Sequence, residues 1–242
     1  MLRDIQPAFL LLTFLAEVTG TVGGFGSSVF FVPVAALYLS MYSALGLTAL
    51  FHLFSNLSKL LLFRSGLQRH LLLYLGVPAV VMVLAGSLLA GRLPEALLQR
   101  FLGVFLVLSS LLLLWRQTSI SPQSQAATIF GGALSGLAAG LLGTGGAIRG
   151  ITMASFNLEK SAFVATSAFI DLCVDATRTV VYYRNGFIQK DLLIYVPFLL
   201  LIALLGTWAG QRILRHVPQT RFRQLSLLLV LAIGVFTLWN SF

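Results

Sequence analysis

Hydrophobic residues dominate the chain in long runs separated by short polar turns. Residues 70–90, 96–115 and 220–241 each form such a run, and a helix needs about 20 mostly apolar residues to cross a bilayer. The runs lack the alternation of apolar and polar residues that a transmembrane β-strand requires, and a helix satisfies its own backbone hydrogen bonds in lipid. The pattern therefore predicts an all-α polytopic membrane protein. Its first apolar run is interpreted as an uncleaved span.

The chain repeats its own landmarks at a constant offset. The matched residues are glycine, arginine, proline and tryptophan, which coincide by chance less readily than leucine does. At an offset of 120, and of 124 after a four-residue insertion, the pairs are Gly20 and Gly140, Gly23 and Gly143, Gly26 and Gly146, Arg64 and Arg184, Gly66 and Gly186, Gly86 and Gly206, Arg92 and Arg212, Pro94 and Pro218, and Trp115 and Trp239. We therefore predict a first transmembrane repeat unit at 1–115, a polar linker at 116–126 and a second unit at 127–242.

Each predicted unit begins with a helix that runs into glycines, followed by a short apolar piece and three longer spans. The segments are 7–20, 28–39, 43–63, 70–90 and 96–115 in the first unit, and 127–142, 147–157, 161–183, 190–214 and 220–241 in the second. If each glycine break lies within one span, the chain has about eight spans in two parallel four-span units. If each break is a hairpin or re-entrant turn, each unit has an odd number of passes and the units are inverted. Eight main spans are the working prediction, since the loop charges barely separate the two topologies.

Composition supports a membrane location and narrows the class of partner. Hydrophobic residues make up 58% of the chain and charged residues 10%, with a mean hydropathy of +0.94, whereas a soluble domain has about 25% charged residues. The net charge is +9, and the basic residues gather in short loops, where they set topology and contact lipid head groups. Aromatic residues are not interleaved among them, so no nucleic-acid partner is expected. The one cysteine, Cys173, excludes an intrachain disulfide.

The glycine clusters that follow the first helix of each unit are the first candidate for a binding site. Several glycines unwind a helix, and unwound backbone at membrane depth is tolerated only where protein or a cavity covers it. The next helix then presents unpaired N–H donors and partial positive charge to an anion, and glycine breaks at matching positions of two halves indicate a transporter site. The predicted substrate-binding residues are Gly23, Gly24, Gly26, Ser27, Gly143, Thr144, Gly145 and Gly146.

Close helix packing through small residues is the alternative for these glycines. Gly132, Gly136 and Gly140 follow small-xxx-small spacing, and we assign this trio to packing. The segment GTGGAIRG (143–150) is not a nucleotide-binding loop, because no strand precedes it and the Gly-Lys-Ser/Thr ending is absent.

Polar residues inside the third apolar piece of each unit are the second candidate. They share one helical face in each unit and are His52, Ser55, Asn56 and Lys59 in the first and Asp171, Asp175 and Arg178 in the second. Ionisable groups in a span are costly and normally face the interior or a cavity. We expect Asn56, Lys59 and Arg178 to bind an anion, with Arg178 able to hold an oxyanion bidentately, and Asp171 or Asp175 to carry a coupling proton. The alternatives are an internal Asp175–Arg178 ion pair, a Lys59 that snorkels to the interface and a structural His52.

Two further charges lie beside the glycine clusters. Glu17 precedes Gly20 by three residues, and its repeat counterpart is Leu137, so the shared architecture does not require it. It would either carry a coupling proton or cap the unwound segment. Arg149 has Val29 as its counterpart and would bring positive charge to the site or point to the membrane interface.

The chain resembles a known transporter family at its glycine clusters. The matched openings are AEVTGTVGGFGSS (16–28) and LAAGLLGTGGAIRG (137–150), and each is followed by a span that ends in a basic-glycine turn, FRSG (63–66) or YYRNG (182–186). These segments resemble the sulfite exporter TauE/SafE family, also called the toluene sulfonate uptake permease family, over about residues 10–240. The resemblance implies an inner-membrane permease for sulfur-containing anions such as sulfite and sulfonates, coupled to an ion gradient. The Asp-Asp-Arg stripe of the second unit departs from the family and bears on the substrate.

Residues and resemblance together lead us to expect a multi-pass secondary transporter of the plasma membrane that moves a small anion. The expected partners are that anion, the bilayer and a coupling proton or sodium ion; a homodimer is left open, and neither cofactor nor metal is expected. An intramembrane enzyme is the first alternative, but the chain has no HExxH motif and Cys173 has no histidine one turn away. A non-transporting scaffold is the second alternative, and it would not need polar stripes in both halves.

Overall fold

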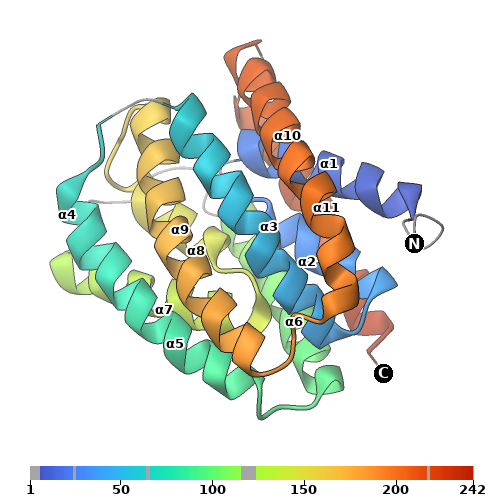
Figure 1. Cartoon of the computed structure of the whole chain (residues 1–242). Helices are drawn as coiled ribbons and strands as arrows, with labels where there is room; N and C mark the ends of the chain where they lie inside the picture. The colour runs from blue at the N-terminus through green and yellow to red at the C-terminus, as the bar shows by residue number, and fades with distance from the viewer. Residues whose placement is uncertain (1–5, 24–25, 64–65, 116–123, 217–218, 242) are drawn as a thin grey trace.

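The computed structural model describes residues 6–23, 26–63, 66–115, 124–216 and 219–241, and these residues form helices and connecting turns without a strand (Figure 1). The first half contains α1 (Pro7–Gly23), α2 (Ser28–Tyr38), α3 (Met41–Leu62), α4 (Arg69–Leu71), the π-helical turn η1 (Leu72–Gly76), α5 (Val77–Ala90) and α6 (Glu95–Trp115). The second half contains α7 (Gln125–Leu142), α8 (Gly146–Ala154), α9 (Lys160–Arg184), the 3₁₀ turn η2 (Lys190–Tyr195), α10 (Val196–His216) and α11 (Gln219–Trp239). The predicted all-helical class is confirmed for the described residues.

The first glycine cluster lies at the turn of a helical hairpin. Phe9 near the start of α1 packs on Tyr38 at the end of α2, with ring centroids 5.4 Å apart. Near the other end of α1, the Glu17 carboxylate accepts a hydrogen bond from the hydroxyl of Ser27, immediately before α2. The two helices are therefore antiparallel, and we call α1–α2 the first hairpin.

The second glycine cluster has the same place in the second half. A Cβ on Gly131 of α7 would contact Thr152 near the end of α8, and the Ser135 hydroxyl donates to the carbonyl of Gly145 at the turn, 2.9 Å away. α7 and α8 are thus antiparallel as well, and we call them the second hairpin. Of the two topologies open from the sequence, this geometry corresponds to the one in which each glycine break reverses the chain.

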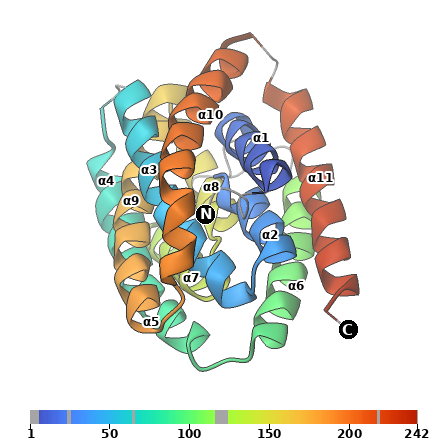
Figure 2. The same cartoon turned by 45° about the vertical axis from the view of Figure 1, so that its right-hand side comes forward.

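Two pairs of long helices pack side by side and run in opposite directions. Along α3 and α9, Asn56 donates to Asp175, while the backbone N–H of Gln68, beyond the end of α3, donates to Thr166, nearer the start of α9. α6 and α11 also run antiparallel: Gly103 lies against Leu238, and Gly234 lies against Leu106 and Val107. Figures 1 and 2 show α9 beside α3, and Figure 2 shows α11 beside α6.

Helices α5 and α7 run parallel and in close contact. The glycines of α7 permit this approach, because a Cβ would overlap the facing carbonyls of α5. The pairs are Gly132 with Leu75 of η1, Gly136 with Ala79, and Gly140 with Val83. The assignment of this trio to helix packing is confirmed.

Helices α1 and α10 form a parallel pair of the same kind, but there the glycines lie on the supporting helix, α10, and not on the helix of the hairpin. A Cβ on Gly206 would lie 2.9 Å from the Glu17 side chain, and a Cβ on Gly210 would lie 2.8 Å from Thr21. Each hairpin is therefore held against a long helix of the other half.

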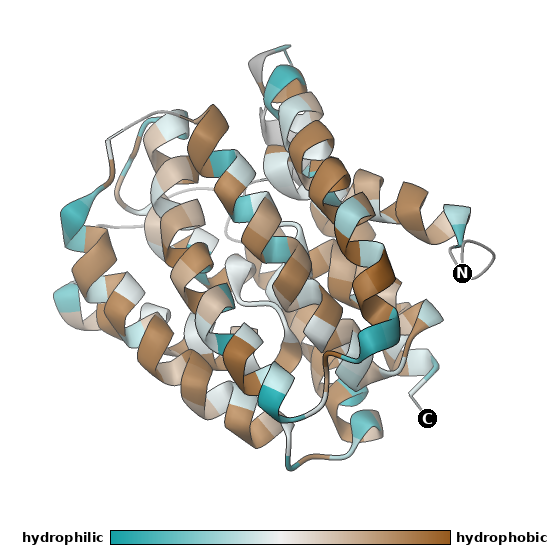
Figure 3. Ribbon diagram, in the orientation of Figure 1, coloured by the Kyte–Doolittle hydropathy of each residue, from teal (hydrophilic) through white to brown (hydrophobic). Residues whose placement is uncertain are grey.

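The outer surface of the bundle is apolar. Leu108, Val81 and Leu201 are among many exposed aliphatic side chains, and Figure 3 shows hydrophobic colour along most of the helical ribbons. Five helical segments of the described chain are long and apolar enough to cross a membrane: Met41–Leu62, Arg69–Ala90, Glu95–Trp115, Gln125–Leu142 and Lys190–Leu214. Such a surface suits lipid rather than water, so the chain is a multi-pass membrane protein.

Candidate functional site

The turns of the two hairpins meet in the interior of the bundle. The Ser28 hydroxyl, at the start of α2, donates to the Thr144 hydroxyl between α7 and α8 at 3.1 Å. Gly26 has a φ of +83°, a conformation that glycine adopts without strain, and a Cβ there would lie 3.9 Å from Arg149 Nη2. The fold thus brings together residues of the two glycine clusters, which are far apart in the sequence.

Helices α2 and α8 both begin at this meeting point. The hydroxyl of Ser27, the N-cap of α2, is directed to Glu17 instead of to the helix, and Gly145, the N-cap of α8, has no side chain. Neither first turn therefore receives a side-chain cap. A helix start carries partial positive charge and free N–H donors, so two such ends converge on one interior region.

Glu17 is the centre of the first polar cluster. Its carboxylate is fully buried and forms an ion pair with Lys59 Nζ at 3.1 Å. Four hydroxyls also donate to it: Ser27 at 2.5 Å, Ser55 at 2.7 Å, Thr207 at 2.8 Å and Thr21 at 3.3 Å. The charge is thus compensated by partners from α1, α3, α10 and the hairpin turn, as a buried carboxylate requires.

Arg149 of α8 forms a second cluster with α9. One of its terminal nitrogens pairs with the Asp171 carboxylate, and its Nε donates to the Ser167 hydroxyl at 2.9 Å. Ser167 and Asp171 are one helical turn apart and share a face of α9. Arg149 is almost fully buried, so it lies in the interior and not at the membrane interface.

Asp175 and Arg178 form a third cluster, deeper between α3 and α9. Their ion pair measures 2.8 Å, and Asn56 donates to the other carboxylate oxygen of Asp175 at 2.7 Å. Arg178 also donates to the Ala139 carbonyl at 2.9 Å, and Tyr182 donates to the Gly140 carbonyl at 2.7 Å. Both acceptors belong to the last turn of α7, where the Ala139 carbonyl also accepts from the backbone N–H of the C-cap residue Gly143. Arg178 therefore caps a helix as well as pairing with Asp175.

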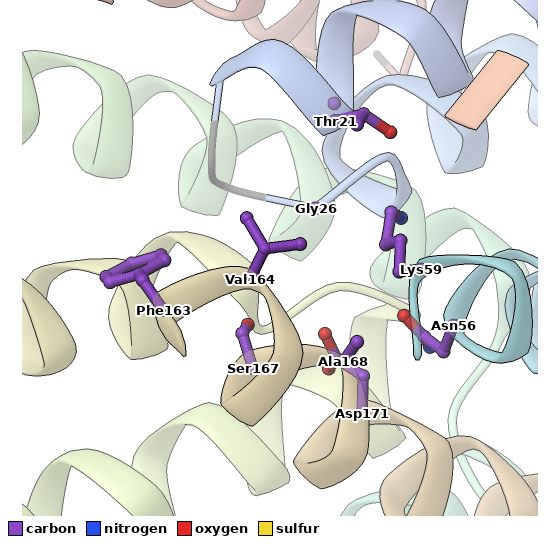
Figure 4. A pocket seen from close by; sticks show the side chains of 10 residues that line it. Thr21, Gly26, Asn56, Lys59, Phe163, Val164, Ser167, Ala168 and Asp171 are labelled. Atoms are coloured by element: carbon purple, nitrogen blue, oxygen red, sulfur yellow. The ribbon is translucent and has the colours of Figure 1, made fainter. Parts of the chain in front are cut away.

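A small cavity of about 30 Å³ lies between the first hairpin, α3 and α9, about the size of one water molecule. Its polar lining is Thr21, Asn56, Lys59, Ser167 and Asp171. In Figure 4, Asn56 and Lys59 come from α3, Ser167 and Asp171 come from α9, and the segment with Gly26 passes across from them. The cavity is partly open to the outside rather than enclosed.

The predicted site residues divide by their distance from this cavity. Gly26, Asn56, Lys59 and Asp171 line it, and Arg149 reaches it through Asp171. The other predicted residues do not line it. Ser27 and Glu17 belong to the first cluster, and Asp175 and Arg178 belong to the third. The remaining ones lie in the hairpins: Gly23 at the buried end of α1, Thr144 at the contact with Ser28, and Gly143, Gly145 and Gly146 in the turn of the second hairpin and at the start of α8. Gly24 lies outside the described residues.

Three polar residues near the site were not predicted from the sequence. Ser167 could have been found, because it lies one turn before Asp171 on the same helical face. Thr21 and Thr207 carry no such signal, since both are single hydroxyls in apolar helices.

His52 of α3 packs against Phe31 and Phe51, and its Nε2 has no hydrogen-bond partner among the described residues.

The positive charges that were expected to attract an anion are all neutralised in this structure. Lys59 pairs with Glu17, Arg149 with Asp171, and Arg178 with Asp175. An anion that enters must therefore compete with a carboxylate for its cation.

A family model described as Sulfite exporter TauE/SafE matches residues 9–237, nearly the whole chain. No curated protein and no solved structure matches the chain.

Proposed function

The chain belongs to the sulfite exporter TauE/SafE family, a family of membrane transporters, and on that premise we propose that it is a secondary transporter of the plasma membrane for a small anion. Its substrate class would be a sulfur-containing oxyanion or an organosulfonate. Transport coupled to an ion gradient, rather than to a chemical reaction, accounts for a buried polar site without a cofactor motif in the sequence.

The observation that carries this proposal is the convergence of positive groups at one interior cavity. Lys59 lines this cavity, Arg149 reaches it through its ion pair with Asp171, and the uncapped starts of α2 and α8 meet beside it, where Ser28 contacts Thr144. Helix starts and guanidinium groups both bind oxyanions. A scaffold protein would have no use for such an arrangement at membrane depth, where it is costly.

The arrangement of helices supports two inverted units. Gly86 of α5 contacts Leu137 of α7, and Gly206 of α10 contacts Glu17 of α1. These two contacts are equivalent in the repeat, because Gly206 is the counterpart of Gly86 and Glu17 is the counterpart of Leu137 at the offset of 120. Both pairs are parallel, whereas α3–α9 and α6–α11 pair each helix with its own repeat counterpart in the antiparallel sense. In this proposal the hairpins enter the membrane from opposite sides and meet at their turns, and the longer helices cross it. Movement of one hairpin and its supporting helix would open the cavity to one side at a time.

Flux measurements in proteoliposomes test the proposal. Purified protein should transport at least one of sulfite, methanesulfonate, isethionate and sulfoacetate, and protein-free liposomes should not. The variant Arg149→Gln should lower flux by about tenfold or more, because a hydrogen bond to a charged group contributes about 1.5–3 kcal/mol.

Arg92→Gln is the matched control, since Arg92 is exposed and lies far along the chain from either hairpin turn. Its flux should equal that of the wild type. If none of the anions shifts the melting temperature and none is transported, the proposal is contradicted and a scaffold is favoured.

A further inference from the structure

The three buried carboxylates of the site differ in how firmly they are held. Glu17 has Lys59 and four hydroxyls as partners, and its side chain is 0% exposed. Asp175 is held by Asn56 and Arg178, and its side chain is 3% exposed. Asp171 has Arg149 as its one polar partner among the described residues, is 17% exposed and lines the cavity. Asp171 is therefore the carboxylate that water reaches most easily. It also loses the fewest polar interactions when it separates from its partner.

Arg149 is the cation best placed to change partners. Its Nε and one terminal nitrogen are used by Ser167 and Asp171, whereas its Nη1 makes no hydrogen bond within the described part of the chain. Gly26 lies opposite and leaves space beside the guanidinium, since even a Cβ there would remain 3.9 Å from Nη2. Arg178 also has one nitrogen without a partner among the described residues, its buried Nε, but both of its terminal nitrogens are used, by Asp175 and by the end of α7, and it does not line the cavity.

Charge balance decides what must accompany an anion into this site. The three ion pairs sum to zero, and one more negative charge in a buried site at membrane depth is costly unless it is compensated. Protonation of one carboxylate restores the balance and frees one cation at the same time. A proton and a monovalent anion can then occupy the site together at the same net charge as the empty site.

We propose that Asp171 takes up one proton for each anion bound, and that Arg149 exchanges the Asp171 carboxylate for the anion. This inference rests on the proposed anion transport and deepens it. A proton from the bulk solvent, relayed by water that enters the cavity, protonates a carboxylate oxygen of Asp171, the ion pair with Arg149 opens, and oxygens of the anion take the place of the carboxylate. Release of the anion and the proton on the other side re-forms the pair, so the transporter is a proton–anion symporter.

The charged groups around Asp171 are consistent with this role. α8 supplies Arg149, α3 supplies Lys59, and α9 itself supplies Arg178 and Asp175. Lys59 and Arg178 already have carboxylate partners of their own. Helices α5 and α7, which also pack on α9, carry no charged residue, and the only titratable side chain of η1, Tyr74, packs on His70. His52 on α3 packs against Phe31 and Phe51. Within the described ranges, no other cation near Asp171 is therefore left for an incoming anion.

Proton uptake on binding tests the inference directly. Methanesulfonate and isethionate are suitable probes, because they have no group that titrates near neutral pH. Weakly buffered wild-type protein in detergent should take up about one proton per bound sulfonate, and the affinity should fall about tenfold per pH unit once Asp171 is ionised in the free protein. Asp171→Asn should bind the same sulfonates without proton uptake and with an affinity independent of pH. The exposed Asp191→Asn is the matched control and should keep the uptake of the wild type.

A second variant covers the case in which Asp171→Asn leaves Arg149 unpaired and fails to fold. Arg149→Gln combined with Asp171→Asn removes both charges, and it should fold without either sulfonate binding or proton uptake. Where Asp171→Asn does fold, added methanesulfonate should raise its melting temperature more than that of the wild type at neutral pH. Sulfonate binding by the wild type without proton uptake, or unchanged uptake in Asp171→Asn, would overturn the inference and leave anion transport standing. Absence of both binding and flux in the wild type would instead overturn the proposed function itself.

Discussion

The two hairpins have the same shape but are held in place by opposite charges. The first is fixed by a buried acid: Glu17 on α1 collects hydroxyls from its own turn and from α3 and α10. The second is fixed by a buried base and a phenol: Arg178 and Tyr182 on α9 donate to the last carbonyls of α7. The first hairpin therefore carries its own anchor, a hydrogen-bond acceptor on α1. The second hairpin is anchored by hydrogen-bond donors that belong to a neighbouring helix, α9.

The difference shows which features the shared shape requires. At the offset of 120, Glu17 corresponds to Leu137, and Arg178 corresponds to Ser58, so neither anchor is present in both halves. The glycines of the turns are present in both, because they permit the reversal of the chain. The anchors also determine how the cations are paired: Lys59 is held by Glu17, and Arg178 by Asp175 and the end of α7, whereas Arg149 is the cation that we propose for the solute.

The largest effect should come from removing the acid anchor. Glu17→Gln keeps the shape of the side chain but leaves Lys59 charged and unpaired, which costs about 3–5 kcal/mol for a buried pair. Chemical unfolding in detergent micelles would measure the loss in the free energy of unfolding. Glu17→Gln combined with Lys59→Met should recover much of it, and the exposed Glu159→Gln should change stability by less than about 0.5 kcal/mol. A loss under about 1 kcal/mol in Glu17→Gln would mean that hydroxyls alone hold the hairpin.

The next effect concerns how each hairpin packs on its supporting helix. Gly136→Ala should cost about 1–3 kcal/mol, because its Cβ would overlap the Ala79 carbonyl, and backbone cannot move aside easily. Gly206→Ala meets the Glu17 side chain instead, at 2.9 Å, and should cost less. Gly66 has no atom within 4 Å of an added Cβ, so Gly66→Ala is the control. Equal losses at Gly136 and Gly206 would show that the two interfaces are equally rigid.

The sequence predicted the backbone of these hairpins better than their anchors. Glycine clusters leave a local signal, since only glycine tolerates both the φ of Gly26 and the close approach at Gly140. Helical periodicity likewise placed Asp171 and Asp175 on one face of α9. The sequence leads to eight main spans as the working prediction, whereas the structure reverses the chain at each break, because almost balanced loop charges barely separate the two topologies.

The pairing of the charges could not be predicted in the same way. Asp175 and Arg178 are three residues apart on one helix, so their ion pair was an open alternative from the start. Glu17 finds Lys59 and Thr207 only after three helices pack together, and no spacing in the sequence encodes that contact. Arg149 pairs with Asp171 because the second hairpin places α8 beside that part of α9, and this placement also cannot be derived from spacing in the sequence.

Loss of one donor from the second anchor should have a moderate effect. Tyr182→Phe removes the hydrogen bond to the Gly140 carbonyl and should lower the free energy of unfolding by about 0.5–1.5 kcal/mol. The adjacent Tyr183 is 71% exposed, so Tyr183→Phe is a matched control with an expected change near zero. If both variants behave alike, Arg178 alone caps the end of α7.

The smallest effect should come from the contact between the hairpins themselves. Ser28→Ala and Thr144→Val each remove a hydroxyl from the 3.1 Å hydrogen bond that joins the two turns. A double-mutant cycle should give a coupling energy of about 0.5–1 kcal/mol, because the pair is buried but neutral. In the proposed transport cycle, a weak link would let the two turns separate while Glu17 and Arg178 keep each hairpin intact. A coupling energy above that of the Tyr182 hydrogen bond would argue instead that the two turns move as one body.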